Sequence, residues 1–198
     1  MATAAETKEN KYKYGLKNVY FALIKEETEE TTTYDTPTKV NGAVSLSIKS
    51  TAERTAIAAD DDEEYAVIEE NKGYEGDIEF QNLPDAFRVS VLGESLDKNG
   101  VLIENKDAQT VRAALMFEFS GDAHKTRHLL YNCRFSKPDI ESGTKGEKIE
   151  NKTDKLSIKC MPSKTTGDIK AKAKTGDAAY ANWFKSVYIK DSTVTASK

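Results

Sequence analysis

Three carboxylates recur at every second position near the end of one predicted strand: Glu75, Asp77 and Glu79. Side chains at this spacing share one face of a strand, roughly 6.8 Å apart, so the pattern predicts an acidic stripe. A general acid and a general base could be drawn from it, but that chemistry needs two environments that push the pKa values apart. The sequence gives no sign of unlike environments, and a hydrolase is therefore the least favoured class.

A second acidic group consists of five adjacent carboxylates, Asp60, Asp61, Asp62, Glu63 and Glu64. Their mutual repulsion favours an extended, solvated loop unless a cation or a basic partner is present. The run lacks the spaced oxygen ligands and the glycine of a calcium-binding loop. It therefore predicts a solvated or partner-contacting loop rather than a metal site.

The other reactive residue types give no recognisable catalytic pattern. His124 and His128 lie in or beside one predicted turn, where a solvated histidine is the usual case. Cys133 and Cys160 fall in predicted strands without a CxxC or Cys/His grouping, which indicates reduced core residues. Phosphate-binding glycine motifs are missing as well. The sequence thus predicts no catalytic residue, no cofactor and no metal.

Charge is unevenly distributed along the chain. The formal net charge is −4, yet residues 26–79 carry sixteen acids and four bases, whereas residues 136–198 carry thirteen lysines and eight acids. Such a split could make subunits attract one another head to tail. The alternative is two separately solvated faces, which is the commoner meaning of charge runs.

The most regular stretch of the sequence is a predicted antiparallel hairpin, residues 111–119 and 127–135, around a polar turn at 120–126. Apolar residues alternate on both segments, which predicts one buried face. The remaining elements are too short or too polar to form a core alone. We expect them to pack onto this hairpin.

The remaining pattern predicts a mainly β fold with two helices. Further strands are expected at residues 16–24, 43–49, 101–103 and 155–160, with a second hairpin of 65–69 and 74–80 and a lysine-bearing edge strand at 169–174. A flanking α-helix is expected at 83–93, with proline at its start and glycine at its end. A C-terminal helix is expected to begin at Asp177 and to bury Tyr180, Trp183, Phe184 and Val187.

The length of 198 residues suits a single domain spanning residues 1–198. Low apolar content predicts flexible segments: the N-terminus (1–13), three long loops (25–36, 50–64 and 136–151) and the C-terminal tail (191–198). No apolar run is long enough to span a bilayer, and residues 1–10 lack the apolar stretch of a secretory signal. We therefore expect no membrane insertion.

Short stretches, spread in order through most of the chain, carry a resemblance to a known family. They include YGLKNVYFA at residues 14–22 and GYEGD at 73–77, together with residues 34–37, 42–46, 91–94, 98–104, 117–122, 127–128, 131–133, 137–138 and 183–188. In these stretches the sequence resembles the major tail proteins, or tail tube proteins, of long-tailed bacteriophages of the siphovirus type.

The resemblance implies a β-sandwich or barrel-like fold of two packed antiparallel sheets, which assembles into hexameric rings stacked as a hollow tube. The implied partners are further copies of the chain, a tape measure protein, a tail terminator and distal tail proteins. Genomic DNA would pass through the tube without specific binding. The implied locations are the virion tail and, during assembly, the host cytoplasm. The family has no catalytic motif to carry over.

Two hypotheses follow for the acidic residues. Asp60 to Glu64 and the stripe Glu75, Asp77 and Glu79 either line an acidic lumen that repels DNA phosphates or meet lysines of an adjacent subunit. The main alternative for the whole chain is a monomeric β-sandwich module that binds a carbohydrate or a receptor.

Overall fold

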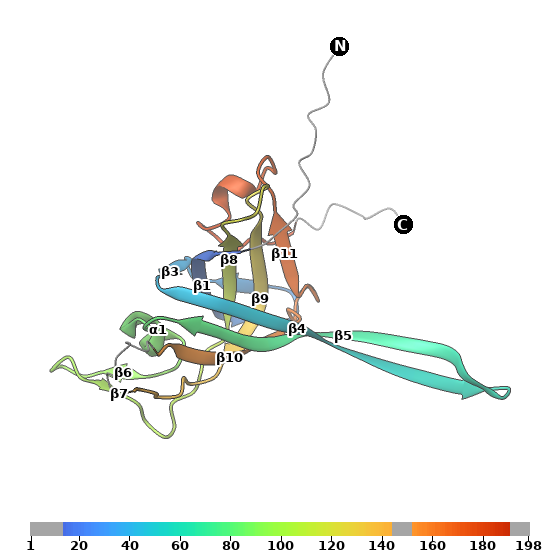
Figure 1. Ribbon diagram of the computed structural model, residues 1–198, viewed down its shortest axis with the longest axis horizontal. Coiled ribbons are helices and arrows are strands. Elements are labelled where there is room, and N and C mark those ends of the chain that lie inside the picture. The colour runs from blue at the N-terminus through green and yellow to red at the C-terminus, as the bar shows by residue number, and fades with distance from the viewer. Residues whose placement is uncertain (1–13, 144–151, 191–198) are drawn as a thin grey trace, which may run out of the picture.

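The computed structural model describes residues 14–143 and 152–190, and strands dominate this part of the chain (Figure 1). The strands are β1 (Leu16–Glu27), β2 (Thr32–Tyr34), β3 (Thr38–Val40), β4 (Ala43–Ala59), β5 (Asp62–Phe80), β6 (Ser95–Leu96), β7 (Leu102–Ile103), β8 (Ala113–Phe119), β9 (Arg127–Phe135), β10 (Asp154–Met161) and β11 (Lys170–Ala173). One α-helix, α1 (Asp85–Ser90), and one 3-10 helix, η1 (Tyr180–Asn182), complete the described elements. The mainly β prediction is confirmed.

Nine strands form one antiparallel sheet in the order β2-β1-β8-β9-β10-β5-β4, with β3 added to β1 and β11 added to β9. Strands β6 and β7 form a separate small sheet. The large sheet bends so that β10, β5 and β4 run across β1, β8 and β9 (Figure 1). We call these two layers the β5 wall and the β8 wall. The two packed layers expected from the sequence are therefore made by one continuous sheet.

The predicted central hairpin is present as β8 paired with β9, but it is buried on both faces. Leu115 and Phe117 of β8 face the core between the two walls, whereas Ala114 and Met116 face a second apolar cluster. The expectation of one buried face was wrong because small alanines on the second face let another segment pack closely there.

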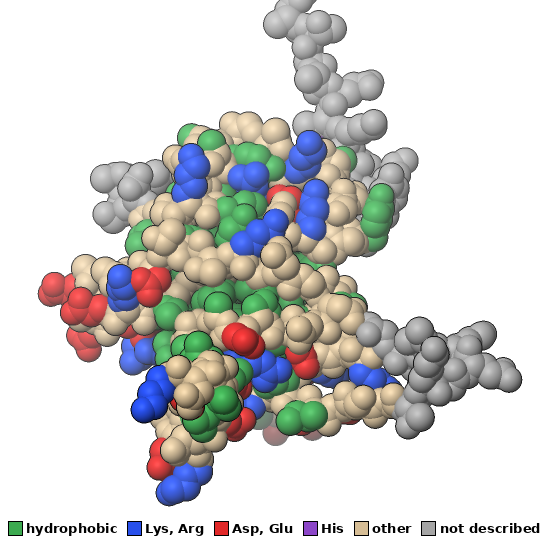
Figure 2. Space-filling model, turned by 90° about the vertical axis from the view of Figure 1, so that its left-hand side faces the viewer, with side chains coloured by type: hydrophobic (Ala, Val, Ile, Leu, Met, Phe, Trp, Pro, Cys, Tyr) green, Lys and Arg blue, Asp and Glu red, His purple; other side chains and the backbone are tan. Residues whose placement is uncertain are grey.

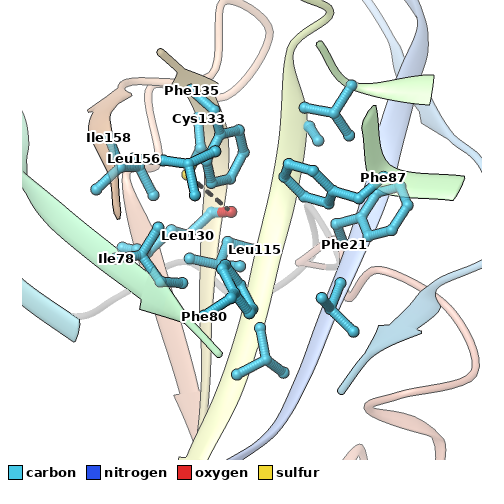
Figure 3. Packing of buried hydrophobic residues seen from close by; sticks show 14 of the residues in the cluster. Phe21, Ile78, Phe80, Phe87, Leu115, Leu130, Cys133, Phe135, Leu156 and Ile158 are labelled. Carbon is cyan, nitrogen blue, oxygen red and sulfur yellow. Dashed lines mark hydrogen bonds between the residues drawn. The ribbon is translucent and has the colours of Figure 1, made fainter. Parts of the chain in front are cut away.

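Phe87 on α1 closes the first core, which lies between the walls (Figure 3). Its ring meets Phe21 of β1 and Phe135 of β9 edge to face, at centroid distances of 5.1 and 5.4 Å. The predicted flanking helix is confirmed, although it is shorter than residues 83–93. It ends before Gly93, whose φ of 77° and close approach to the Gln109 carbonyl leave no room for a side chain.

The second core is covered by the C-terminal segment, with Trp183 and Val187 buried against β8 and β9. The predicted helix capped by Asp177 is wrong, because only one 3-10 turn, η1, forms there. The Asp177 carboxylate instead accepts a hydrogen bond from the Lys174 backbone N–H at 2.7 Å. That contact closes the preceding turn. The Asp177 carboxylate is therefore not used to cap a helix in the following residues.

Arg127 holds this segment in place from β9. Its guanidinium carbon lies 3.8 Å from the ring centroid of Tyr180 and 4.7 Å from that of Phe184, and Nη1 donates a hydrogen bond to the Tyr180 carbonyl. The Nε atom lies 3.4 Å from the buried Glu118 carboxylate. One cation therefore joins the sheet to the C-terminal segment.

Replacing Arg127 by alanine should lower the free energy of unfolding by about 2 kcal/mol, since a stacked cation and a charge-assisted hydrogen bond are both lost. Urea titration followed by the fluorescence of the single tryptophan, Trp183, measures this. Arg127→Lys keeps the charge without the planar stack and should recover only part of the loss. An unchanged unfolding midpoint in Arg127→Ala would rule out this role.

Burial also affects two tyrosines at the border of the second core. Desolvation is the main cause that raises the pKa of both Tyr34 and Tyr131 well above the ordinary value, and the charge of Glu27 adds to it at Tyr34. The Tyr34 hydroxyl also donates a hydrogen bond to the Tyr131 carbonyl, at 3.4 Å. Both groups thus stay neutral in the folded protein at pH values where a free phenol ionises.

Because these pKa values are raised by folding, their contribution to stability is complete below about pH 10 and is lost as the pH rises further. We expect the free energy of unfolding to fall between about pH 10 and 11, and to fall less steeply in Tyr34→Phe. Denaturant titrations at several alkaline pH values test this. Parallel curves for the wild-type protein and Tyr34→Phe would contradict it.

Two of the predicted loops are not loops. Residues 50–64 belong to a long hairpin, with β4 reaching Ala59 and β5 beginning at Asp62. The separate hairpin predicted around residues 71–73 is also wrong, since β5 runs through them without a break. The arrangement forms because Thr55–Ile57 and Ala66–Ile68 pair as β-prone segments.

Within 25–36, only residues 28–31 and 35–36 lie outside strands, because β1 continues to Glu27 and β2 spans Thr32–Tyr34. An ion pair of 2.6 Å between Glu27 and Arg112 compensates for the missing apolar residues. Residues 136–143 carry no helix or strand, and the rest of that predicted loop (144–151) lies outside the described residues. The flexible ends predicted at 1–13 and 191–198 also lie outside them.

Candidate assembly surfaces

The most conspicuous surface is the outer part of the β4–β5 hairpin, residues 51–72, which we call the arm. It begins where β10 stops pairing with β5, at Tyr74, and it extends away from both walls (Figure 1). Apart from the half-buried Thr51 and Ala59, every arm residue is exposed. The arm therefore has no covering layer within the described residues.

Local sequence explains the shape of the arm. Asp60 and Asp61 form its tip between the paired residues Ala59 and Asp62, and both have positive φ values, 52° and 63°. Two such residues in succession make the tight turn that matches the twist of a hairpin, and aspartate tolerates it better than most residues. At the base, Gly73 has a φ of 121°, and a Cβ there would collide with the Cys160 carbonyl.

The arm is strongly acidic, with eight Asp or Glu and two Lys or Arg in residues 51–72. Lys72 pairs with Glu53 and Glu70, and Arg54 pairs with Glu64. Among the described residues, no basic side chain forms an ion pair with the remaining tip carboxylates, which are Asp60, Asp61, Asp62 and Glu63. The predicted acidic run thus lies at a projecting tip with uncompensated charge.

The arm also exposes large apolar side chains, a feature that the sequence analysis missed. The exposed fractions are 43% for Ile57, 62% for Tyr65, 38% for Val67 and 57% for Ile68. An isolated two-stranded hairpin is marginally stable in water, and exposed apolar groups on it favour contact with another surface. The signal was present in the sequence as the short apolar runs 56–59 and 65–68 on either side of the acidic run.

The stripe Glu75, Asp77 and Glu79 lies elsewhere, on the β5 wall. Strand pairing places Lys159 and Lys49 beside Glu75, and Lys155 beside Glu79. The structure therefore does not bring the two predicted acidic groups together. It surrounds the stripe with lysines on both neighbouring strands.

Asp77 shows how closely the stripe is compensated. Lys155 Nζ lies 3.1 Å from its carboxylate, and the Ser157 hydroxyl donates a hydrogen bond at 3.0 Å. These two contacts, Lys155 first, hold the pKa of Asp77 below its ordinary value, and Asp77 in turn raises the pKa of Lys155. Glu79 accepts a hydrogen bond from the Ser45 hydroxyl at 3.0 Å. One ion pair and two hydrogen bonds thus join the stripe to its neighbouring strands.

The cysteines are core residues, as predicted. Cys133 and Cys160 are free thiols, buried opposite each other on β9 and β10, and burial is the largest cause that raises the pKa of Cys133. Among the described residues, no three His, Cys, Asp or Glu side chains are grouped as metal ligands. None of the described helices is long and apolar enough to cross a membrane.

Basic side chains gather in another part of the molecule. Figure 2 shows one face on which Lys and Arg side chains cluster over the upper part, at the height of the C-terminal segment in Figure 1. The charge segregation predicted from the sequence is therefore only partly a segregation in space, because Lys155 and Lys159 lie beside the acidic stripe.

The bent sheet and the projecting arm define a mainly β protein with an uncovered apolar and acidic surface. A scan against protein-family models matches residues 4–165 to the model described as phage tail tube protein. The chain belongs to this family, and the identification made from the sequence is confirmed. It therefore assembles with other tail proteins into the tube of a virion tail. A search of curated proteins finds no match to the chain.

Proposed function

We propose that the chain forms six-membered rings that stack into a hollow conduit for genomic DNA. The observation that carries this proposal is the arm, because its large apolar side chains are exposed and its tip carboxylates have no basic partner among the described residues of the same chain. A contact between unlike surfaces of identical subunits closes into a ring or repeats into a filament, depending on the rotation it imposes. Both outcomes are needed for a tube made of rings.

Open strand edges support the same proposal. Among the described strands, β11 pairs only with β9, and β4 pairs only with β5. Exposed edges offer unpaired backbone groups that another chain can satisfy. Ring formation that joined sheets from neighbouring subunits would cover them.

Further parts of the proposal come from the family to which the chain belongs. Residues 1–198 act as a single tail tube domain of the siphovirus type, without catalytic activity. The tube surrounds a tape measure protein and meets a tail terminator and distal tail proteins at its ends. It assembles in the host cytoplasm, and DNA later passes through without specific binding.

The two acidic groups have different roles in this proposal. The lysines beside Glu75, Asp77 and Glu79 reduce the repulsion that this stripe alone would exert on DNA phosphates. If the stripe lines the lumen, Glu75→Lys with Glu79→Lys should slow DNA ejection severalfold. Wild-type ejection kinetics in that variant would show that the stripe does not line the lumen. The tip carboxylates, which lack basic partners, are the better candidates for contact with another subunit.

Particle mass tests the proposal against a monomeric module that binds carbohydrate or a receptor. Sedimentation velocity over a wide concentration range should show species of at least six subunits at high concentration, and negative-stain images of the same samples should show rings or tubes. A particle of 21.9 kDa at every concentration would favour the monomeric module.

A further inference from the structure

A groove lies between the two walls at the end of the core near the base of the arm. Its volume is about 640 Å³, which lies within the usual range for binding pockets. Leu46 and Ile48 line it from the β5 wall, and Phe117 and Phe119 line it from the β8 wall. Leu46, Ile48 and Phe119 are only half-buried, so the first core is incompletely covered here.

The rim of the groove is basic. Ala171 and Ala173 of β11 pack on the second core, and the alternation of the strand therefore turns Lys170 and Lys172 to the groove side. Lys170 Nζ donates a hydrogen bond to the Tyr74 hydroxyl and lies 4.6 Å from the centroid of its ring. The residues that line the groove include both lysines and no Asp or Glu.

The apolar lining and the basic rim of the groove are complementary to the arm, which carries exposed apolar side chains next to carboxylates without basic partners. The arm of the same chain leaves the β5 wall and extends away from it, so it does not fold back into its own groove (Figure 1). About ten residues per strand give it a reach of roughly 30 Å, enough to cross to another subunit. An identical chain is therefore the partner that supplies such an arm.

We propose that the groove receives the arm of a second copy of this chain. Tyr65 and Val67, which share one face of the incoming arm, cover the half-buried apolar side chains of the groove, and Glu63 on that face and Asp62 at the tip meet Lys170 and Lys172. This inference rests on the proposed tube function and adds to it the identity of the receiving surface. The contact joins two unlike surfaces, so it repeats from copy to copy.

Charge exchange between the two surfaces tests the proposal. Lys170→Glu with Lys172→Glu in the groove should raise the critical concentration for tube formation about tenfold or more, because like charges then face each other. Asp62→Lys with Glu63→Lys in the arm should do the same. Combining the four substitutions should bring the critical concentration back to within about threefold of the wild type.

The matched control is Lys98→Glu with Lys106→Glu, which makes the same charge change at exposed positions outside the groove. It should assemble as the wild type does. Normal assembly of the groove variant, or a combined variant no better than either parent, would overturn the proposal.

Cross-linking locates the contact directly. Tubes formed from a mixture of Tyr65→Cys and Lys172→Cys copies should yield mixed dimers on oxidation, whereas Tyr65→Cys mixed with Lys98→Cys should not. If tubes form without the first cross-link, the groove is not the receiving surface and the tube function still stands. If no variant and no wild-type sample assembles, the proposed function fails and this inference fails with it.

A basic rim could also hold nucleic acid phosphates, and a short DNA oligonucleotide distinguishes that use. We expect equally weak DNA binding by the wild type and by Lys170→Glu with Lys172→Glu. DNA that binds the wild type much more tightly and blocks the Tyr65 cross-link would overturn the proposal in favour of a phosphate site.

Discussion

Replacing residues 51–73 by Asn-Gly should abolish tube assembly and leave the two cores folded. The replacement joins the paired residues Ser50 and Tyr74 through the two-residue connection that hairpins favour. Burial of one large apolar side chain is worth about 1.5–3 kcal/mol. Losing Ile57, Tyr65, Val67 and Ile68 together should therefore raise the critical concentration at least about 100-fold. A pelleting assay over a concentration series measures it.

The fold should survive because, among the described residues, neither core cluster contains a member from the arm. Circular dichroism and Trp183 fluorescence report on the shortened protein before assembly is attempted. A milder variant with threonine at the same four apolar positions keeps the strand propensity and should assemble at intermediate concentrations. Normal tubes from the arm-less protein would exclude the arm from assembly, and its unfolding would contradict the independence of arm and core.

Phe87→Ala should lower the free energy of unfolding by about 3–5 kcal/mol, the usual cost of emptying a large aromatic site in a core. Phe87 is 1% exposed, and its ring meets those of Phe21, Phe80 and Phe135. This loss is a large part of the total stability of a typical domain. Urea unfolding of the assembly-deficient, arm-less protein gives the value without interference from tubes.

Val89→Ala on the same helix is the matched control, because Val89 is 38% exposed. A surface substitution of this kind should change the free energy of unfolding by no more than about 0.5 kcal/mol. If both variants lost the same stability, the effect would come from helix propensity and not from the aromatic cluster. The account of how α1 closes the first core would then be wrong.

Elements with clear periodicity could be predicted from the sequence. The central hairpin, the helix around Phe87, the alternation that buries Leu156 and Ile158 of β10, and the lysine-bearing edge strand β11 all occur where expected. In the helix and in strands β10 and β11, the apolar spacing and the core that it faces agree. Local pattern and tertiary packing then favour the same secondary structure.

The arm could not be predicted in this way, because its residues face no core. The run Asp60 to Glu64 indicates a solvated loop by composition, and its aspartates are a weaker turn signal than Asn-Gly. Backbone pairing of Thr55–Ile57 with Ala66–Ile68 nevertheless forms a hairpin. Sequence reasoning therefore found the acidic site but assigned it the wrong local structure.

The surroundings of the acidic stripe could not be predicted either, for a different reason. Glu75, Asp77 and Glu79 were correctly expected on one face of a strand, but their neighbours depend on strand order. Lys155 and Lys159 come from β10, about 80 residues further along the chain. A single sequence does not reveal such long-range pairing, and the compensation of this charge became visible only in the sheet.

The most direct test of the central claim, that this chain is a subunit completed by copies of itself, is cryo-electron microscopy of the purified protein at high concentration. The account predicts a hollow tube built of rings of six subunits, with the arm of each subunit lying against a different copy. Particles that remain single subunits, or tubes in which every arm points into solvent, would contradict it.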